Sequence, residues 1–370
     1  MASTRILNAA VIGTGFIGMV HARAVRAAGH RVAAIVGIDE DSARQVAADV
    51  SADLVLDSVA EMLRLDEIDV VHVCTPNALH AEQARLALEH GKHVICEKPL
   101  ATSVDDARGL CTLARQLGLV TAVPFAYRFY PTVREARARV MSGEAGRVRL
   151  LHGSYLQDWL ADAGDTNWRV DSAVGGASRA FADIGVHWCD LIEFTTGHRL
   201  TRVAAHLYTV PERRTMGNGS TGHTEDVATV MFETDQGAVG SVIVSQVSLG
   251  RKNRLWFSID GTDAALSFNQ EVPDTLWIGG LDANQEVFRG SAATSAAAHR
   301  YDVLPAGHPQ GFQNSFEALV GDAYATVLGE HRDGLPTFED GLRATVITQA
   351  VLHSARTESW VKVPPSTELG

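Results

Sequence analysis

The chain has 370 residues, of which 46% are hydrophobic and 21% are charged, and it carries a formal net charge of −12 at pH 7. The length favours two domains, and the negative charge argues against a nucleic acid or an anionic membrane surface as a partner. No apolar run is long enough to span a bilayer, and the first one is too short for a signal peptide, so we expect a cytoplasmic protein. The four cysteines (Cys74, Cys96, Cys111 and Cys189) have no metal-ligand spacing, which indicates free thiols in a reducing compartment and no metal site.

The first motif, Gly13-Thr14-Gly15-Phe16-Ile17-Gly18, follows a short apolar run that predicts a strand. The apolar period then lengthens and predicts a helix over 17–28. A strand, a glycine turn and a helix are the context in which G-x-G-x-x-G binds a dinucleotide. Gly13 allows the tight turn, Gly15 lets a pyrophosphate approach the backbone, and Gly18 lets the helix pack on the strand. The alternative is a glycine-rich turn of any α/β domain.

Strands and helices then alternate as far as residue 123. Strands are predicted at 31–36, 69–74, 92–96 and 119–123, and helices at 41–49, 78–89 and 103–117. Ser103 can cap the last helix and Gly118 can end it. This alternation predicts an α/β fold with a parallel, doubly wound sheet in residues 1–125.

The end of the second strand bears on the choice between NAD and NADP. A Rossmann domain for NAD usually has Asp or Glu there, bound to the ribose 2′-OH. Gly37 takes this place, and Asp39 could serve from the following turn. No Arg or Lys lies at 37–40 to hold a 2′-phosphate, which Asp39 and Glu40 would repel. We therefore expect NAD, with NADP left open.

Beyond Pro124 the pattern changes. Helices are predicted at 130–141, 178–195, 309–329 and 339–356, and strands at 147–156, 200–209, 226–234, 237–247, 253–260 and 264–269. Strands that follow one another without helices predict an antiparallel sheet in a second domain, residues 126–370.

Three groups of residues could carry a reaction. Lys98 follows a parallel strand, at the sheet edge where open α/β proteins bind ligands, although it could be an ordinary surface lysine. Asp183 and His187 would share a helix face, where the carboxylate would fix the imidazole for proton transfer. The alternative is a capping Asp and a core histidine, and Asp190 lies on the same face. Asn167-Trp168-Arg169 offers a ring and a donor fork for a nicotinamide or a phosphate, or else pins a loop.

Together the motifs resemble the Gfo/Idh/MocA oxidoreductases, the glucose–fructose oxidoreductase and inositol dehydrogenase family. The resemblance rests on the glycine motif and on five further stretches across nearly the whole chain. These are Thr75-Pro76-Asn77-Ala78-Leu79-His80, Tyr127-Arg128-Phe129, Glu97-Lys98-Pro99-Leu100, Asp183-Ile184-Gly185-Val186-His187-Trp188-Cys189-Asp190 and Pro336-Thr337-Phe338-Glu339-Asp340-Gly341.

This resemblance implies a Rossmann domain followed by an α/β domain with a large, open, mostly antiparallel sheet that binds substrate and often forms oligomers. It implies reversible hydride transfer between NAD(P) and a secondary alcohol of a sugar or cyclitol. Lys98, Asp183 and His187 match the catalytic residues of the family, and a cis peptide bond is expected before Pro99. Gly37 departs from the acidic residue of NAD-preferring members. The loop 156–169 resembles members that act on pyranosides and anhydrosugars, such as levoglucosan dehydrogenase.

Cofactor contacts are expected from Gly13, Gly15, Phe16, Ile17, Gly18, Asp39, Thr75, Pro76, Asn77, His80, Glu97, Lys98, Arg128, Trp168 and Arg169. Substrate contacts are expected from Lys98, Arg128, Tyr155, Gln157, Asp183, His187 and His308. His187 would remove the hydroxyl proton, Asp183 would orient its ring, and Lys98 would stabilise the oxygen without a metal.

Two other functions stay open from the sequence. One is an NADPH-dependent keto-sugar reductase, which runs the same site in reverse. The other is a nucleotide-binding sensor without turnover, against which the complete set of Lys98, Asp183 and His187 argues. We expect a small-molecule sugar or cyclitol as the partner, and a homo-oligomer, either a dimer or a tetramer.

Overall fold

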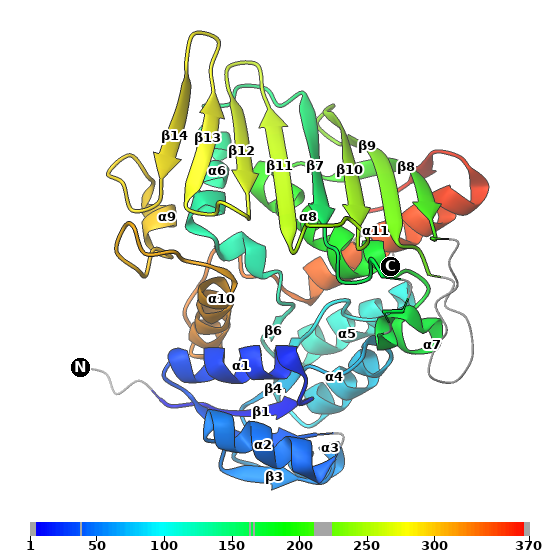
Figure 1. Cartoon of the computed structure of the whole chain (residues 1–370). Helices are drawn as coiled ribbons and strands as arrows, with labels where there is room; N and C mark the ends of the chain where they lie inside the picture. The colour runs from blue at the N-terminus through cyan, green and yellow to red at the C-terminus, as the bar shows by residue number, and fades with distance from the viewer. Residues whose placement is uncertain (1–4, 38, 163, 166, 211–223, 366–370) are drawn as a thin grey trace. The chain divides into compact units, whose positions relative to one another are not determined.

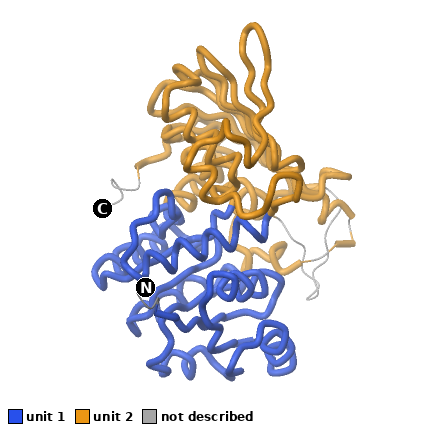
Figure 2. Tube along the Cα trace, turned by 90° about the vertical axis from the view of Figure 1, so that its left-hand side faces the viewer, with its two compact units in different colours: residues 1–126, 312–342 blue, residues 127–311, 343–370 orange. Residues whose placement is uncertain are grey.

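The computed structural model describes residues 5–37, 39–162, 164–165, 167–210 and 224–365. Two compact units make up the chain (Figure 2): residues 1–126 and 312–342 form unit 1, and residues 127–311 and 343–370 form unit 2. The sequence led us to expect domains of residues 1–125 and 126–370. That division places residues 312–342 in the second domain, whereas they belong to unit 1.

Unit 1 is built on a six-stranded sheet of order β3-β2-β1-β4-β5-β6 (Figure 1). All neighbouring strands in it are parallel. The strands are β1 (Asn8–Ile12), β2 (Arg31–Val36), β3 (Leu54–Leu56), β4 (Val70–Val73), β5 (His93–Cys96) and β6 (Thr121–Ala122). The order reverses between β1 and β4, which is the Rossmann arrangement that binds ligands at the carboxyl ends of these strands. The doubly wound sheet is therefore confirmed.

Helices connect these strands. They are α1 (Phe16–Ala27), α2 (Glu40–Val50), α3 (Val59–Leu63), the short turn η1 (Asn77–Leu79) with α4 (His80–Glu89), and α5 (Val104–Leu117). The sequence predicted these elements except β3 and α3, which are short. The predicted caps of α5 are confirmed, because Ser103 accepts the amide of Asp106 at 3.1 Å and Gly118 has a φ of 65°. A cap of this kind stabilises a helix by about 1 kcal/mol.

The segment 312–342 belongs to unit 1 through specific contacts. It contains α10 (Phe312–Val327), which packs on α1, and the first residues of α11 (Phe338–Thr357). The amide of Val123 donates to the carbonyl of Pro336 at 3.0 Å. A Cβ on Gly341 would lie 2.8 Å from the Cβ of Leu100, so only glycine allows this close approach. The Pro336–Gly341 motif thus packs against the segments that follow β5 and β6.

Unit 2 contains a nine-stranded sheet of order β14-β13-β12-β11-β7-β10-β9-β8-β15 (Figure 1). Only β7 and β10 pair in parallel among its described strands, so the mostly antiparallel sheet is confirmed. The strands are β7 (Leu150–Leu156), β8 (Leu200–Tyr208), β9 (Val227–Thr234), β10 (Val239–Ser245), β11 (Arg254–Asp260), β12 (Ala265–Asn269), β13 (Thr275–Gly279), β14 (Asn284–Phe288) and β15 (Val361–Lys362). The sequence missed β13, β14 and β15.

The helical elements of unit 2 lie mainly against one face of this sheet. They are η2 (Ala126–Phe129), α6 (Pro131–Met141), η3 (Trp168–Val170), α7 (Ser172–Gly175), η4 (Phe181–Gly185), α8 (Val186–Thr196), α9 (Ala296–His299) and the part of α11 from Arg343 on. Helix α6 packs on β12 and β13, and α8 packs on β7 and β11. Side chains of β9 and β10 therefore alternate between buried and outward-facing positions.

The opposite face of the sheet carries exposed apolar side chains. Leu150, Met231, Val239 and Ile243 are between 37% and 54% exposed. Val239 pairs with Leu150, and Met231 pairs with Ser241, which lies between Val239 and Ile243. These four side chains form one patch, here called the open-face patch.

The cysteines, the helix lengths and the acidic and histidine side chains bear on disulfides, membrane spans and metal sites. All four cysteines are buried and free, as predicted. In the described part of the chain, no helix has the length and apolar character to cross a membrane, and no three His, Cys, Asp or Glu side chains gather in a way that could hold a metal ion.

Candidate active site

The glycine turn between β1 and α1 is shaped by close backbone contacts. Gly13 has a φ of 109°, and a Cβ on it would lie 2.4 Å from the carbonyl oxygen of Cys74. A Cβ on Gly18 would lie 2.0 Å from the carbonyl oxygen of Gly13. Gly15 has open space around its Cα, and as the N-cap of α1 it leaves the first helical N–H groups without a side-chain cap. These donors at a helix N-terminus fit a pyrophosphate.

The end of β2 explains why the acidic residue is displaced. A Cβ on Gly37 would lie 2.8 Å from the Cβ of Ala43 and 2.9 Å from Cγ2 of Thr14, so no side chain fits there. Asp39 is the N-cap of α2, where its carboxylate accepts the amide and the hydroxyl of Ser42 at 2.8 and 2.9 Å. These hydrogen bonds from Ser42 lower the pKa of Asp39, which stays ionised. Ile38, between them, lies outside the described residues.

The turns after β4 and β5 are joined by His80. Its ring nitrogens lie 2.7 Å from the carbonyl of Pro99 and 2.8 Å from that of Thr75. Burial lowers the pKa of His80, although both carbonyl contacts oppose this effect. His80 is only 1% exposed, so its side chain supports the two turns that carry Thr75, Pro76, Asn77, Glu97 and Lys98. The expected cis peptide bond between Lys98 and Pro99 is confirmed.

The helix expected over 178–195 has a different beginning. A π-helical turn, η4, precedes α8, and Asp183 lies in it while His187 lies in the first turn of α8. Glu225 caps the start of this segment: its carboxylate accepts the hydroxyl of Ser178 and the amides of Arg179 and Phe181 at 2.6 to 3.0 Å. These donors are thereby bound outside the helix. π-Turns of this kind often occur at functional sites.

Asp183 is held by side chains from two other segments. Its Oδ2 accepts Nε2 of Gln246 at 2.7 Å, and its Oδ1 lies 3.5 Å from Nε of Arg169. Gln246 is fully buried, and its Oε1 accepts Nη1 of Arg179 at 3.1 Å. This contact fixes the amide orientation of Gln246, because its NH₂ group must then face Asp183. Arg179 is itself ion-paired with Asp226, and both side chains are 1% exposed.

His187 lies beside a group of hydroxyls and amides. Its ring is 5.1 Å, centroid to centroid, from the ring of Tyr127, and the phenol groups of Tyr127 and Tyr155 are hydrogen-bonded to each other. Asn253 accepts the hydroxyl of Tyr155 at 2.7 Å and Nε2 of Gln157 at 2.8 Å. Burial raises the pKa of both tyrosines, so both remain protonated donors. These groups are suited to a ligand with several hydroxyls.

Arg128 forms part of the interior of unit 2. Its Nε donates to Asp190 at 2.8 Å and its Nη2 to the other oxygen of that carboxylate, and the guanidinium lies over the ring of Phe194. Both charged side chains are less than 8% exposed. The contacts account for Arg128 as a structural residue between η2 and α8.

Trp168 and Arg169 lie together in η3, with the guanidinium 4.3 Å from the centre of the indole ring. A Cβ on Gly175 would lie 2.7 Å from the carbonyl oxygen of Arg169, so glycine at this position lets the two backbone segments pack closely. Arg169 is thereby kept beside Asp183.

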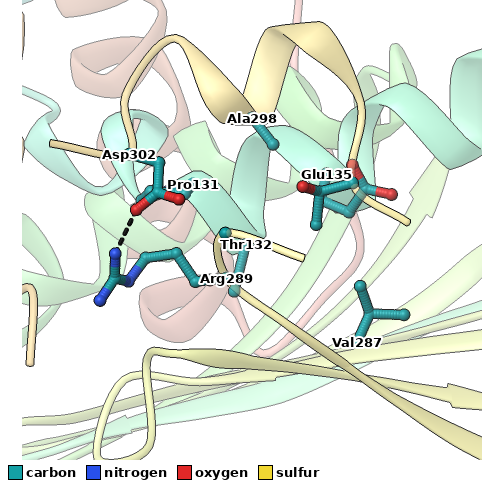
Figure 3. A pocket seen from close by; sticks show the side chains of 9 residues that line it. Pro131, Thr132, Glu135, Val287, Arg289, Ala298 and Asp302 are labelled. Atoms are coloured by element: carbon teal, nitrogen blue, oxygen red, sulfur yellow. Dashed lines mark hydrogen bonds and ion pairs between the residues drawn. The ribbon is translucent and has the colours of Figure 1, made fainter. Parts of the chain in front are cut away.

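His308 lies elsewhere in unit 2. It is exposed, its ring contacts the carbonyl of Pro305 at 3.2 Å, and its own carbonyl accepts Nη2 of Arg289. Arg289 also binds Asp302 in the pocket shown in Figure 3, which lies between α6 and the loop 289–302. This pocket contains none of the predicted catalytic residues, and its charged side chains serve to hold the loop.

Several residues of the unit 2 cluster were not predicted as site residues. Tyr127 lies in a motif that was noted only for its resemblance. Gln246, a polar residue directly after the apolar strand β10, was a detectable signal. Asn253 follows Arg251-Lys252 and looks like a turn residue, and Arg179 and Glu225 carry no local signal of their interactions.

Both units of the chain match known protein families. Residues 7–125 match the family model described as "Oxidoreductase family, NAD-binding Rossmann fold", and residues 133–267 match "GFO/IDH/MocA C-terminal domain". Levoglucosan dehydrogenase of Pseudarthrobacter phenanthrenivorans is 33% identical in an alignment 320 residues long, which covers 80% of this chain and 80% of that one. Inositol 2-dehydrogenase of Mycolicibacterium smegmatis is 27% identical over 358 residues, 94% of this chain and 93% of that one.

Solved structures agree with these sequence matches. A levoglucosan dehydrogenase in complex with NADH and levoglucosan has a TM-score of 0.91 at 30% identity, and the match covers 97% of this chain and 100% of that chain. An oxidoreductase domain protein from Kribbella flavida has the same score and identity, with 98% and 100% covered. The chain belongs to the GFO/IDH/MocA family of oxidoreductases, with an NAD-binding Rossmann fold in its first unit.

Proposed function

We propose that the protein oxidises a secondary hydroxyl of a sugar, anhydrosugar or cyclitol with NAD. The observation that carries this proposal is the cluster around His187, where Tyr127, Tyr155, Gln157 and Asn253 offer hydroxyl and amide groups. Such groups bind neutral polyols, whereas a phosphorylated or carboxylated ligand would favour a cluster of cations. The match to levoglucosan dehydrogenase over most of the chain supports an anhydrosugar or a pyranoside as the substrate class.

Lys98, Asp183 and His187 are the catalytic residues in this proposal. NAD, when bound, supplies the hydride acceptor. His187 accepts the hydroxyl proton of the substrate as a general base, and Asp183 orients the imidazole and stabilises the imidazolium that forms. Lys98 donates a hydrogen bond to the same substrate oxygen and stabilises its developing negative charge. Gln246 and Arg169 hold Asp183 for this role.

NAD binding is assigned to the unit 1 turns. The N–H groups at the start of α1, opened by Gly15, hold the pyrophosphate, with Phe16 and Ile17 beside them. Asp39 accepts the ribose 2′-OH, and its charge together with that of Glu40 disfavours NADP. Further cofactor contacts are assigned to Thr75, Pro76, Asn77 and Glu97, and to Trp168 and Arg169. His80 and Arg128 act as supports.

The structure also bears on the oligomeric state and on the cellular compartment. The open-face patch of Leu150, Met231, Val239 and Ile243 supports a homo-oligomer formed through the nine-stranded sheet, because isolated proteins seldom expose such a contiguous apolar surface. The four buried free cysteines support a reducing compartment, and hence the cytoplasm.

A panel of sugars, anhydrosugars and cyclitols, each with NAD, tests the proposed reaction through the absorbance of NADH. The Lys98→Ala variant, assayed on the best substrate, should have a kcat lower by about 10²- to 10³-fold, because a donor to the developing oxyanion is lost. Lys362→Ala, at an exposed position of β15, is the matched control and should behave as wild type. Near-normal turnover in Lys98→Ala would remove Lys98 from the mechanism.

A further inference from the structure

A chain of buried polar side chains crosses the core of unit 1. His21 of α1, His72 of β4 and Tyr324 of α10 are each at most 1% exposed. Nε2 of His72 lies 2.9 Å from the hydroxyl of Tyr324, and the two Nδ1 atoms of His21 and His72 are 2.8 Å apart. Nε2 of His21 lies 3.2 Å from Oε1 of Glu97. Three elements far apart in the sequence therefore connect to the residue before Lys98.

The chemistry of the donors fixes the direction of every hydrogen bond in this chain. Glu97 as a carboxylate only accepts, so Nε2 of His21 must donate to it. In a neutral His21 the Nδ1 atom then accepts, which requires the proton of His72 to be on Nδ1. Nε2 of His72 is then an acceptor, and the Tyr324 hydroxyl donates to it. Each group thus donates toward Glu97.

The opposite arrangement leaves a proton without a partner. If His21 were doubly protonated, His72 would donate from Nε2 to the Tyr324 oxygen. The hydroxyl proton of Tyr324 would then have no acceptor in the described part of the chain. A buried donor without an acceptor costs more than the hydrogen bond that it fails to make.

The titration behaviour agrees with this direction. Burial raises the pKa of Tyr324 well above its usual value, so it keeps its proton, and burial lowers the pKa of His72 well below its usual value, so it stays neutral. Burial opposes the ionisation of Glu97, but the hydrogen bond from His21 and the charge of Lys98 lower its pKa. The Glu97 carboxylate, at the end of this series of hydrogen bonds, is therefore charged.

Glu97 passes this orientation to the next residue. Its Oε2 accepts the backbone N–H of Lys98 at 3.1 Å, while Oε1 faces His21. The two oxygens therefore connect the buried chain to the turn from which the Lys98 side chain extends. A carboxylate held at both oxygens has its orientation fixed, and so has the peptide unit that donates to it.

We propose that Tyr324, His72 and His21 are positioning residues that hold Glu97, and through it the backbone of Lys98, by hydrogen bonds that all point toward the Glu97 carboxylate. The proposal rests on the catalytic role proposed for Lys98. It also gives the segment 312–342 a function in unit 1, because Tyr324 is the first donor of the chain.

The directions are measured by ¹⁵N NMR of histidine side chains in the wild-type protein, with the signals assigned by His21→Gln and His72→Gln. We expect a neutral His72 with its proton on Nδ1 and a neutral His21 with its proton on Nε2. A His72 protonated on Nε2, or a doubly protonated His21, would overturn the proposal. This measurement is made on the wild-type protein and needs no activity, and the variants serve only to assign the signals.

The consequence for turnover is measured with Tyr324→Phe. Because one hydrogen bond of the chain is lost, kcat should fall about three- to tenfold, while the Kd for NAD and the KM for the sugar stay close to those of wild type. Thr326→Val is the matched control, since it removes a hydroxyl on the same helix that donates to the carbonyl of Asp322 at 2.8 Å. An unchanged kcat in Tyr324→Phe, beside a strong loss in Lys98→Ala, would overturn the positioning role and leave the proposed function standing. Normal turnover in Lys98→Ala would instead overturn the proposed function itself.

Discussion

Gln246 is the residue outside the predicted set on which Asp183 most directly depends. Gln246→Leu removes two hydrogen bonds with charged groups, one from Arg179 at 3.1 Å and one to Asp183 at 2.7 Å. Each such bond is worth about 1.5–3 kcal/mol, and the added apolar burial of leucine returns about 1–2 kcal/mol. The free energy of unfolding should therefore fall by about 1–5 kcal/mol.

On the proposed mechanism the same substitution should lower kcat about 10- to 100-fold, because Asp183 loses the hydrogen bond from Gln246 that helps to hold it in place for orienting His187. Urea unfolding and steady-state kinetics on the folded variant measure the two effects. Gln236→Leu is the control: this exposed amide donates to the carbonyl of Gly197 at 2.9 Å, and its loss should change stability by at most about 0.5 kcal/mol. If Gln246→Leu keeps kcat within about twofold of wild type, the reasoning about Asp183 is refuted.

Asp39→Ser keeps an acceptor for the α2 amides but removes the negative charge. The ratio of the Kd for NADP to the Kd for NAD, measured by fluorescence titration, should therefore fall about tenfold, while the control Asp41→Asn should leave it unchanged. An unchanged ratio in Asp39→Ser would show that Asp39 does not select the cofactor. Acid should destabilise the protein, because burial lowers the pKa of His30, His72, His80, His93 and His198 below the ordinary 6.5. The unfolded chain then binds more protons than the folded one once the pH drops below about 6.5, so stability present above that pH is lost as it falls. A free energy of unfolding that stays constant between neutral and mildly acidic pH would contradict this.

The fold of unit 1 could be predicted because its signals are local. Each parallel strand is a short apolar run, and glycines such as Gly13 and Gly118 mark the turns that follow strands or helices. The return of 312–342 could not be predicted, since an amphipathic helix shows which side is apolar but not which sheet receives it. The edge strand β14 was missed because its sequence, Asn284–Phe288, is mostly polar and only Val287 is buried.

The part of the candidate site that could be predicted is also the part with local sequence signals. Lys98, Asp183 and His187 lie in motifs that are visible in the sequence. The residues that hold this segment do not lie in such motifs. Glu225 accepts the amide of Phe181, and Gln246 donates to Asp183, so each contacts a residue more than 40 positions earlier in the sequence. His21 and His72 were each single polar residues in apolar segments. Their shared hydrogen bond becomes evident only when α1 and β4 are brought together.

Proton transfer by His187 is the central claim, and the pH dependence of sugar oxidation tests it most directly. In the wild-type enzyme the rate should rise with pH through one ionisation and then level off, because only a neutral imidazole accepts the hydroxyl proton. His187→Asn should remain folded, bind NAD normally, lose about 10²- to 10⁴-fold in kcat and lack this rising limb. A folded His187→Asn variant that keeps the same limb would contradict the account and assign the proton transfer to another group.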